Sequence, residues 1–301
     1  MKEGAQSSAE ARAAAYARID RLLPYAQELV AIRRHLHQHP ELAFEEHGTS
    51  DFVANKLQEW GYAVTRGIGG TGLVASLTHG TGSRRLGLRA DMDALPIQEA
   101  TGAVHASRVA GCMHACGHDG HMTMLLGAAK YLARHRSFSG TLHLIFQPAE
   151  ERGFDSGALA MLKDGLFDRF PCDAVFAMHN HPGVPQGRFL MRSGAFMAAG
   201  DRVFVTIRGV GGHAARPHLA VDPLVAAAAI VTSLQTVVSR NVDPAEIAVV
   251  TVGRLRSGDA LNVIPDEAEI GISVRSFSNE VRALLKRRIT ELITGIAQAH
   301  G

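Results

Sequence analysis

Cysteine, long apolar runs and an excess of one charge are all scarce in this sequence of 301 residues. No apolar run approaches the roughly 18–20 residues that cross a bilayer, so we expect no membrane span. The formal net charge is only +2, and Lys and Arg are dispersed, which argues against binding to nucleic acid. Residues 1–15 lack the apolar core of a signal peptide, and we expect them to form a frayed tail that leads into a helix.

The three cysteines, Cys112, Cys116 and Cys172, cannot all pair with one another. Because no signal peptide is recognisable, we expect a cytoplasmic protein in a reducing compartment. In that setting the thiol of Cys116 is free to bind a metal ion.

The chain is long enough for two domains, and its hydrophobic share of 46% is normal for a protein with a sizeable core. Strands and helices alternate up to about residue 193, which predicts an α/β domain with a mostly parallel sheet. The order β-α-β-β-α that follows predicts a smaller, separate α+β unit. Helices are predicted at 26–38, from a cap at Thr49 or Ser50 to Gly61, up to Arg134, at 158–163, from Pro223 and at 280–299. Strands are predicted at 62–65, 72–77, 85–90, 142–146, 173–178, 202–207, 247–252 and 268–274.

Residues 113–121 form the most informative stretch, because they hold three imidazoles, a thiol and a carboxylate ahead of an apolar helical pattern. Imidazole and thiolate are the side chains that hold zinc and similar ions. Cys116 and His118 alone could equally be a buried thiol beside a surface histidine. His114, His121 and two further polar clusters at strand ends favour a metal site.

The first of these clusters, Glu150 and Glu151, follows the strand predicted at 142–146. If the backbone there is extended, the two carboxylates diverge, so one could bind a metal while the other faces a substrate water. A solvated acidic loop is the commoner meaning of such a pair. The second cluster places His179 at the end of the strand predicted at 173–178, with His181 as a weaker candidate.

Other polar residues are individually ambiguous. Asp91 and Asp93 end the strand predicted at 85–90 and could bind metal, orient a ligand or cap a turn. His213 follows a glycine-rich turn that lacks the pattern of a phosphate loop. Asn262 and Arg275, taken alone, are more often structural.

Together these segments resemble the co-catalytic metallopeptidase family that includes carboxypeptidase G and the aminoacylases. Within it they are similar to the amidohydrolase branch with the hippurate hydrolases and the plant auxin-conjugate hydrolases. The motifs stand in the family's order and span nearly the whole chain from about residue 30. They lie at 34–42, 89–96, 113–121, 147–151, 178–182, 209–217 and 262–265.

The resemblance implies a catalytic α/β metal-binding domain over residues 1–195 and an inserted α+β lid or dimerisation domain over residues 196–301. It implies two divalent metal ions per subunit (zinc, manganese, cobalt or nickel) and a homodimer or higher homo-oligomer joined through the lid. The implied substrate is a small N-acyl amino acid, hippurate-like or N-acetylated. Its amide bond would be cleaved to a carboxylate and an amino acid by water that a glutamate activates beside the metal ions.

The resemblance also implies a role for each matching residue. Glu150 matches the general base, Asp91 matches a carboxylate that supports the site without binding metal, and His213 matches a lid residue that steadies the oxyanion in a partner subunit. Arg89 stands where related branches have a metal-binding histidine, so we do not count it as a ligand. The matching metal ligands are Cys116, His118, Glu151 and His179, and the matching substrate-carboxylate positions are Asn262 and Arg275.

The family continues beyond the lid with a further histidine ligand, whereas this sequence stops at Gly301. We therefore expect the C-terminal return segment to be absent and the lid to be incomplete. A metal-dependent amidohydrolase and a truncated, non-catalytic, metal-binding or dimerising fragment both remain open. A third hypothesis, a structural zinc site at Cys112 and Cys116, lacks a second Cys pair and predicts that chelation unfolds the chain.

Overall fold

The structure, a computed structural model, describes residues 21–301. The chain divides into two compact units, the first ending at Val184 and the second running from Pro185 to Gly301. The tail expected at residues 1–15 lies outside the described residues. The catalytic and lid roles expected on either side of residue 195 stay predictions.

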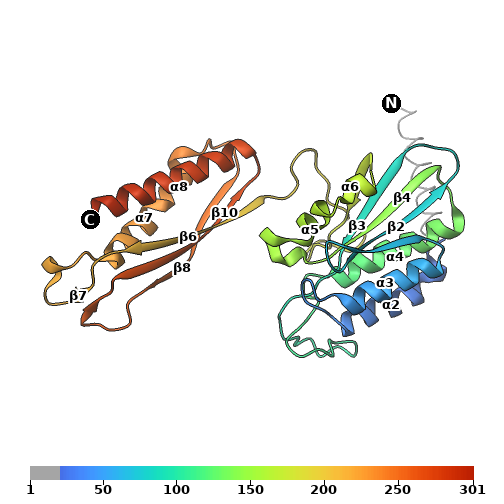
Figure 1. Ribbon diagram of the computed structural model, residues 1–301, viewed down its shortest axis with the longest axis horizontal. Helices are drawn as coiled ribbons and strands as arrows, with labels where there is room; N and C mark the ends of the chain where they lie inside the picture. Colours follow the sequence, from blue (N-terminus) through green and yellow to red (C-terminus); the bar gives the residue numbers. More distant parts are fainter. Residues whose placement is uncertain (1–20) are drawn as a thin grey trace. The chain divides into compact units, whose positions relative to one another are not determined.

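The first unit consists of a five-stranded sheet with helices packed against it (Figure 1). Its strands are β1 (Ala63–Ile68), β2 (Gly72–His79), β3 (Arg85–Asp91), β4 (Gly140–Gln147) and β5 (Ala174–Ala177). Its helices are η1 (Leu23–Tyr25), α2 (Ala26–Gln38), α3 (His47–Glu59), α4 (His118–His135), η2 (Glu150–Asp155), α5 (Gly157–Lys163) and α6 (Leu166–Arg169).

The strand order is β1-β2-β4-β3-β5. β3 runs parallel to both β4 and β5, whereas the β1–β2 and β2–β4 pairs are antiparallel. The α/β class and the mostly parallel sheet are confirmed, because β1, β3, β4 and β5 point the same way and only β2 runs against them. β2 is reversed relative to β1 because the turn at residues 69–71 is short, and so short a connection can join only antiparallel neighbours.

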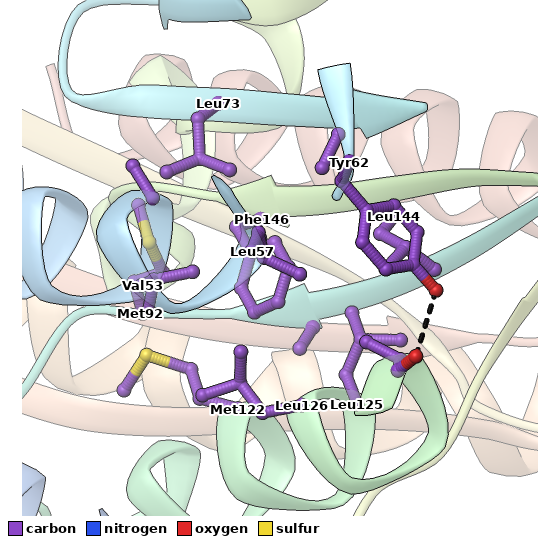
Figure 2. Close-up of a cluster of buried hydrophobic side chains, with 14 of the residues drawn as sticks. Val53, Leu57, Tyr62, Leu73, Met92, Met122, Leu125, Leu126, Leu144 and Phe146 are labelled. Carbon is purple, nitrogen blue, oxygen red and sulfur yellow. Dashed lines mark hydrogen bonds between the residues drawn. The ribbon is translucent and has the colours of Figure 1, made fainter. Parts of the chain in front are cut away.

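Alternate side chains of β2 and β4 point to opposite faces of the sheet and pack in two separate apolar cores. Leu73 of β2 and Leu144 of β4 pack with residues of α2, α3 and α4, in the core drawn in Figure 2. Val74 and Ile145, one residue further along each strand, pack instead with Met161 and other residues around α5 and α6. Helices therefore cover both faces of the sheet, and a buried side chain of this size contributes about 1.5–3 kcal/mol to holding it.

Helix α3 begins earlier than the sequence predicts. Thr49 and Ser50 do not cap it; both are buried in its first turn, which starts at His47. The cap comes from Glu41, whose carboxylate accepts hydrogen bonds from the backbone N–H groups of Gly48 at 3.0 Å and Thr49 at 2.7 Å. A capping carboxylate from outside the helix leaves no local pattern in the sequence.

The second unit has the α+β composition that the sequence predicts. Its strands are β6 (Ala199–Arg208), β7 (Gly212–His213), β8 (Ala248–Ser257), β9 (Val263–Ile264) and β10 (Glu267–Ser276). Its helices are η3 (Pro217–Leu219), α7 (Pro223–Asn241) and α8 (Asn279–Ala299). β10 lies between β6 and β8 in an antiparallel sheet, and β7 pairs with β9 in a second, small sheet.

Helix α7 is long and apolar enough, by length and composition alone, to cross a membrane. Polar residues such as Thr232 and Gln235 interrupt the apolar run of this helix, and the expectation of no membrane span stays a prediction. Ala227, Ile230 and Leu234 of α7 are fully buried and belong to one core with residues of β10 and α8. About a third of its apolar stretch is buried, so one face of α7 packs in this core.

Candidate metal centre

The parallel strands bring three separate motifs to one edge of the first unit's sheet. β3, β4 and β5 point the same way, so their carboxyl ends, Asp91, Gln147 and Ala177, share that edge. The loop after β3 leads to α4, whose first residue is His118. Open α/β sheets place their ligands at this edge, so the polar clusters noted in the sequence meet where chemistry is expected.

Two overlapping groups of side chains there have the spacing of a metal site. Ligand atoms of Cys116, His118 and His179 all lie within 4.8 Å of one another, and so do those of His118, Glu150 and Glu151. Cys116 Sγ lies 3.4 Å from His179 Nε2, although the two residues are 63 positions apart. His118 belongs to both groups and links them into one continuous site.

The histidines present the correct atoms for metal binding. His118 Nδ1 lies 2.7 Å from the backbone oxygen of Asp93, to which it donates its proton. Its Nε2 is buried and has no hydrogen-bond partner among residues 21–301. His179 Nδ1 likewise lies 2.6 Å from the backbone oxygen of Asn180. Occupying Nδ1 leaves the lone pair of Nε2 available, as in most metal-bound histidines, so the residues fit a divalent ion.

The sequence allows an extended backbone, from which Glu150 and Glu151 would diverge. The structure shows a helical turn instead. Both residues begin the short helix η2, after Ala149, which has a φ of 47°. This turn directs both carboxylates toward His118. Burial, reinforced by the negative charge of Glu151, raises the pKa of the Glu150 carboxyl. A carboxyl group with a raised pKa is suited to accepting and returning a proton near neutral pH.

Asp91 is buried and holds His121 and Arg89 beside the site. It lies 2.6 Å from His121 Nδ1 and 2.7 Å from Arg89 Nη1. Burial alone would raise its pKa, but the hydrogen bond from His121 and the charge of Arg89 together hold the pKa well below its usual range. Asp91, His118 and His121 form a third group with metal-type spacing. The second ring nitrogen of His121 contacts Asn180, so His121 is less available as a ligand than His118.

Three contributors receive no definite role from the sequence, which leaves Asp93 between a metal ligand, an orienting group and a turn cap. Asn180 contacts His121, and Gln147 binds the guanidinium of Arg89 through Oε1 at 2.7 and 3.0 Å. Asp93 contacts three residues of the metal-type groups at once. The alternation of Asp91 and Asp93 is the one sequence signal for the third of these, because it places a second carboxylate just past the strand end.

The structural zinc hypothesis gains no support. Cys112 is buried, its Sγ lies 3.6 Å from the backbone oxygen of Pro40, and it is in none of the metal-type groups found among residues 21–301. His181 is exposed and in none of these groups either. His114 is deeply buried, and burial lowers its pKa to about 4.

The candidates of the second unit divide between its two sheets. His213 lies in β7 opposite Val263 of β9, and the backbone oxygen of Asn262 accepts a hydrogen bond from Ala214 at 3.0 Å, so these two candidates are neighbours. Arg275 lies in β10 of the other sheet, where its guanidinium lies against Gly200. A Cβ at that glycine would lie 1.9 Å from Arg275 Nη1.

Metal affinity should depend on pH through Cys116. Burial, together with the charge of Glu151, raises the pKa of this thiol to about 12, so the metal-free thiol keeps its proton at neutral pH. A bound metal ion must displace that proton, and affinity should rise up to about tenfold per pH unit for each proton released. Cys116→Ala should lower the affinity and reduce the slope of log affinity against pH by about one. Isothermal titration with Zn²⁺ at several pH values measures both, and an unchanged slope would exclude Cys116 as a ligand.

Comparison with known proteins places these features among metal-dependent hydrolases. Residues 87–299 match the profile of peptidase family M20/M25/M40. Hippurate hydrolase of Campylobacter jejuni is 48% identical over 282 residues, which cover 94% of this chain and 73% of that protein. N-acetyl-L-cysteine deacetylase of Bacillus subtilis is 44% identical over 272 residues, 89% of this chain but only 64% of that protein.

Among solved structures, the YXEP protein of Bacillus subtilis is described as a dinuclear metal-binding peptidase of the M20 family. It matches this structure with a TM-score of 0.78 at 36% identity, over 92% of this chain and 72% of that one.

Proposed function

The chain belongs to peptidase family M20/M25/M40, a family of metal-dependent amidohydrolases, and we propose that it hydrolyses the amide bond of N-acyl amino acids. The resemblance noted in the sequence is thereby confirmed at the level of family and branch. One observation carries the proposal: Cys116, His118 and His179 converge beside Glu150 and Glu151 at the carboxyl edge of the sheet. The names of the two relatives, a hippurate hydrolase and an N-acetylcysteine deacetylase, favour benzoyl and acetyl groups on the substrate.

We assign Cys116, His118, Glu151 and His179 as the residues that would hold two divalent ions. Their mixed sulfur, nitrogen and oxygen donors suit zinc, manganese, cobalt or nickel. When bound, such ions lower the pKa of a water molecule and polarise the substrate carbonyl. A reducing compartment such as the cytoplasm would keep the thiol of Cys116 free for this role.

The protein's own groups would move the proton. Glu150, with its raised pKa, would accept a proton from the attacking water and deliver it to the leaving nitrogen. Asp91 would stay ionised, because its pKa is held low, and would keep His121 and Arg89 in place. Glu150 alone would therefore serve both proton transfers, the one from water and the one to the leaving nitrogen.

We propose that His213 steadies the oxyanion that forms during attack. Its Nδ1 accepts a hydrogen bond from the backbone N–H of Ala215 at 3.1 Å. The neutral ring therefore carries its proton on Nε2 and presents a donor. Following the family resemblance, we propose that His213 acts in a neighbouring subunit of a homodimer, and that Asn262 and Arg275 bind the substrate carboxylate.

Turnover tests the proposal directly. Incubation with N-benzoylglycine or N-acetyl amino acids should release free amino acid, measured with an amine-reactive reagent. A chelator should abolish this release without unfolding the chain, and added Zn²⁺, Mn²⁺ or Co²⁺ should restore it. Stoichiometric metal binding with no release from any N-acyl amino acid would identify a non-catalytic metal-binding protein instead.

A further inference from the structure

Asp93 lies just beyond the carboxyl end of β3 and is buried, with 1% of its surface exposed. Its two carboxylate oxygens accept hydrogen bonds from two consecutive backbone N–H groups, Oδ1 from Glu150 and Oδ2 from Glu151, each at 2.9 Å. Burial alone would raise the pKa of Asp93, but the hydrogen bonds from His118 and from these N–H groups outweigh burial and lower it. The carboxylate is therefore ionised and fully engaged.

The same residue also holds His118. The backbone oxygen of Asp93 lies 2.7 Å from His118 Nδ1, and its Oδ1 lies 3.4 Å from the same nitrogen. Asp93 thus connects three chain segments: the end of β3, the start of α4 and the turn after β4. Both of its oxygens are occupied, and it is in none of the metal-type groups formed by residues 21–301, so it is poorly placed to bind a metal itself.

The turn that carries the glutamates is held from its other side as well. Ala149 adopts a φ of 47°, a backbone conformation that is strained for a residue with a Cβ and persists only where the surrounding structure holds it. The buried carboxylate of Glu46 accepts a hydrogen bond from the Ala149 N–H at 2.7 Å. The three consecutive backbone N–H groups of residues 149–151 therefore all donate hydrogen bonds to buried carboxylates. Of these two carboxylates, that of Asp93 also lies against a histidine of the site, His118.

We propose that Asp93 is a positioning residue that fixes Glu150 and Glu151 relative to His118. It acts through these residues and touches neither substrate nor metal. The inference rests on the metal centre of the proposed function but not on the identity of the substrate. Removing a group that orients a metal ligand typically lowers metal affinity or activity about 10–100-fold.

Asp93→Asn is the sharpest test, because an amide offers one acceptor oxygen to two N–H groups. Its NH₂ group would face one of them donor to donor. We expect Co²⁺ or Zn²⁺ to bind about 10–100-fold more weakly. At saturating metal, kcat should fall while KM changes little, and the thiolate-to-Co²⁺ absorption of the bound form should shift. Asp93→Ala removes the carboxylate without the donor clash and should weaken metal binding in the same direction, should the Asn variant fail to fold.

Glu41→Gln is the matched control. The carboxylate of Glu41 also accepts two consecutive backbone N–H bonds, from Gly48 and Thr49, but it makes no hydrogen bond to a residue of the site. This variant should lower the melting temperature while leaving metal affinity and the Co²⁺ spectrum unchanged.

The outcomes separate this inference from the proposed function. Unaltered metal affinity and kcat in folded Asp93 variants would overturn the positioning role alone. So would an equal loss of metal affinity in Glu41→Gln, because the loss would then report general destabilisation. If the unaltered protein bound no divalent metal, both the proposed function and this inference would fail.

Discussion

Glu150→Gln should lower the turnover of an N-acyl amino acid by about 10²–10⁴-fold while leaving bound metal nearly intact. The amide keeps the size of the carboxyl group but cannot accept the proton of the attacking water. The raised pKa of Glu150, caused by burial and by the charge of Glu151, marks this residue as the proton carrier of the pair. Steady-state kinetics and metal analysis by mass spectrometry on the same preparation measure both quantities.

Glu151→Gln is the matched variant, one residue along the same turn. We expect it to lose both metal and turnover, because we assign Glu151 as a ligand. Both carboxylates lie within ligand spacing of His118, so the geometry by itself allows either to bind metal. Equal metal loss in the two variants would show that the roles are shared or exchanged.

The second large effect concerns His213. His213→Ala should lower turnover by about 10²–10³-fold, the usual effect of losing one oxyanion donor, with metal content unchanged. The Nε2–H that would be lost is the donor that the hydrogen bond from Ala215 leaves free. Substrate affinity should change less than kcat, because the oxyanion forms only during the reaction.

Mixing two inactive variants tests whether His213 serves a neighbouring subunit. In a heterodimer of His213→Ala with Glu150→Gln, one site would carry both lesions and the other neither. Up to about half of the unaltered activity per heterodimer should return. If no mixing ratio restores activity although exchange of differently tagged subunits is detected, His213 acts within its own subunit or has no catalytic role.

Most element positions follow from local patterns in the sequence. Helix α2 matches its predicted range, and the strand ends that carry Asp91, Glu150 and His179 are recognisable as apolar runs followed by polar residues. Parallel pairing of β3 with its two neighbours then brings these ends together, as the fold class implies. The clustering of Cys116 with His179 could therefore be anticipated.

Other features depend on contacts between distant residues, which no local pattern records. The cap of α3 is supplied by Glu41, so the more familiar signals at Thr49 and Ser50 are misleading. The turn at Glu150 is bent by the left-handed Ala149, which an Ala in the sequence does not announce. For Asp93, the sequence shows a carboxylate near a strand end, but only the fold shows which N–H groups it binds.

Anomalous X-ray diffraction from crystals grown with Zn²⁺ or Mn²⁺ tests the metal centre most directly, because it locates the ions without assuming any ligand. We predict peaks roughly 2.0–2.4 Å from Cys116 Sγ, the Nε2 atoms of His118 and His179, and a carboxylate oxygen of Glu151. Glu150 should face the site without coordinating an ion. Metal peaks on other side chains, or none at this edge of the sheet in metal-saturated protein, would contradict the assignment.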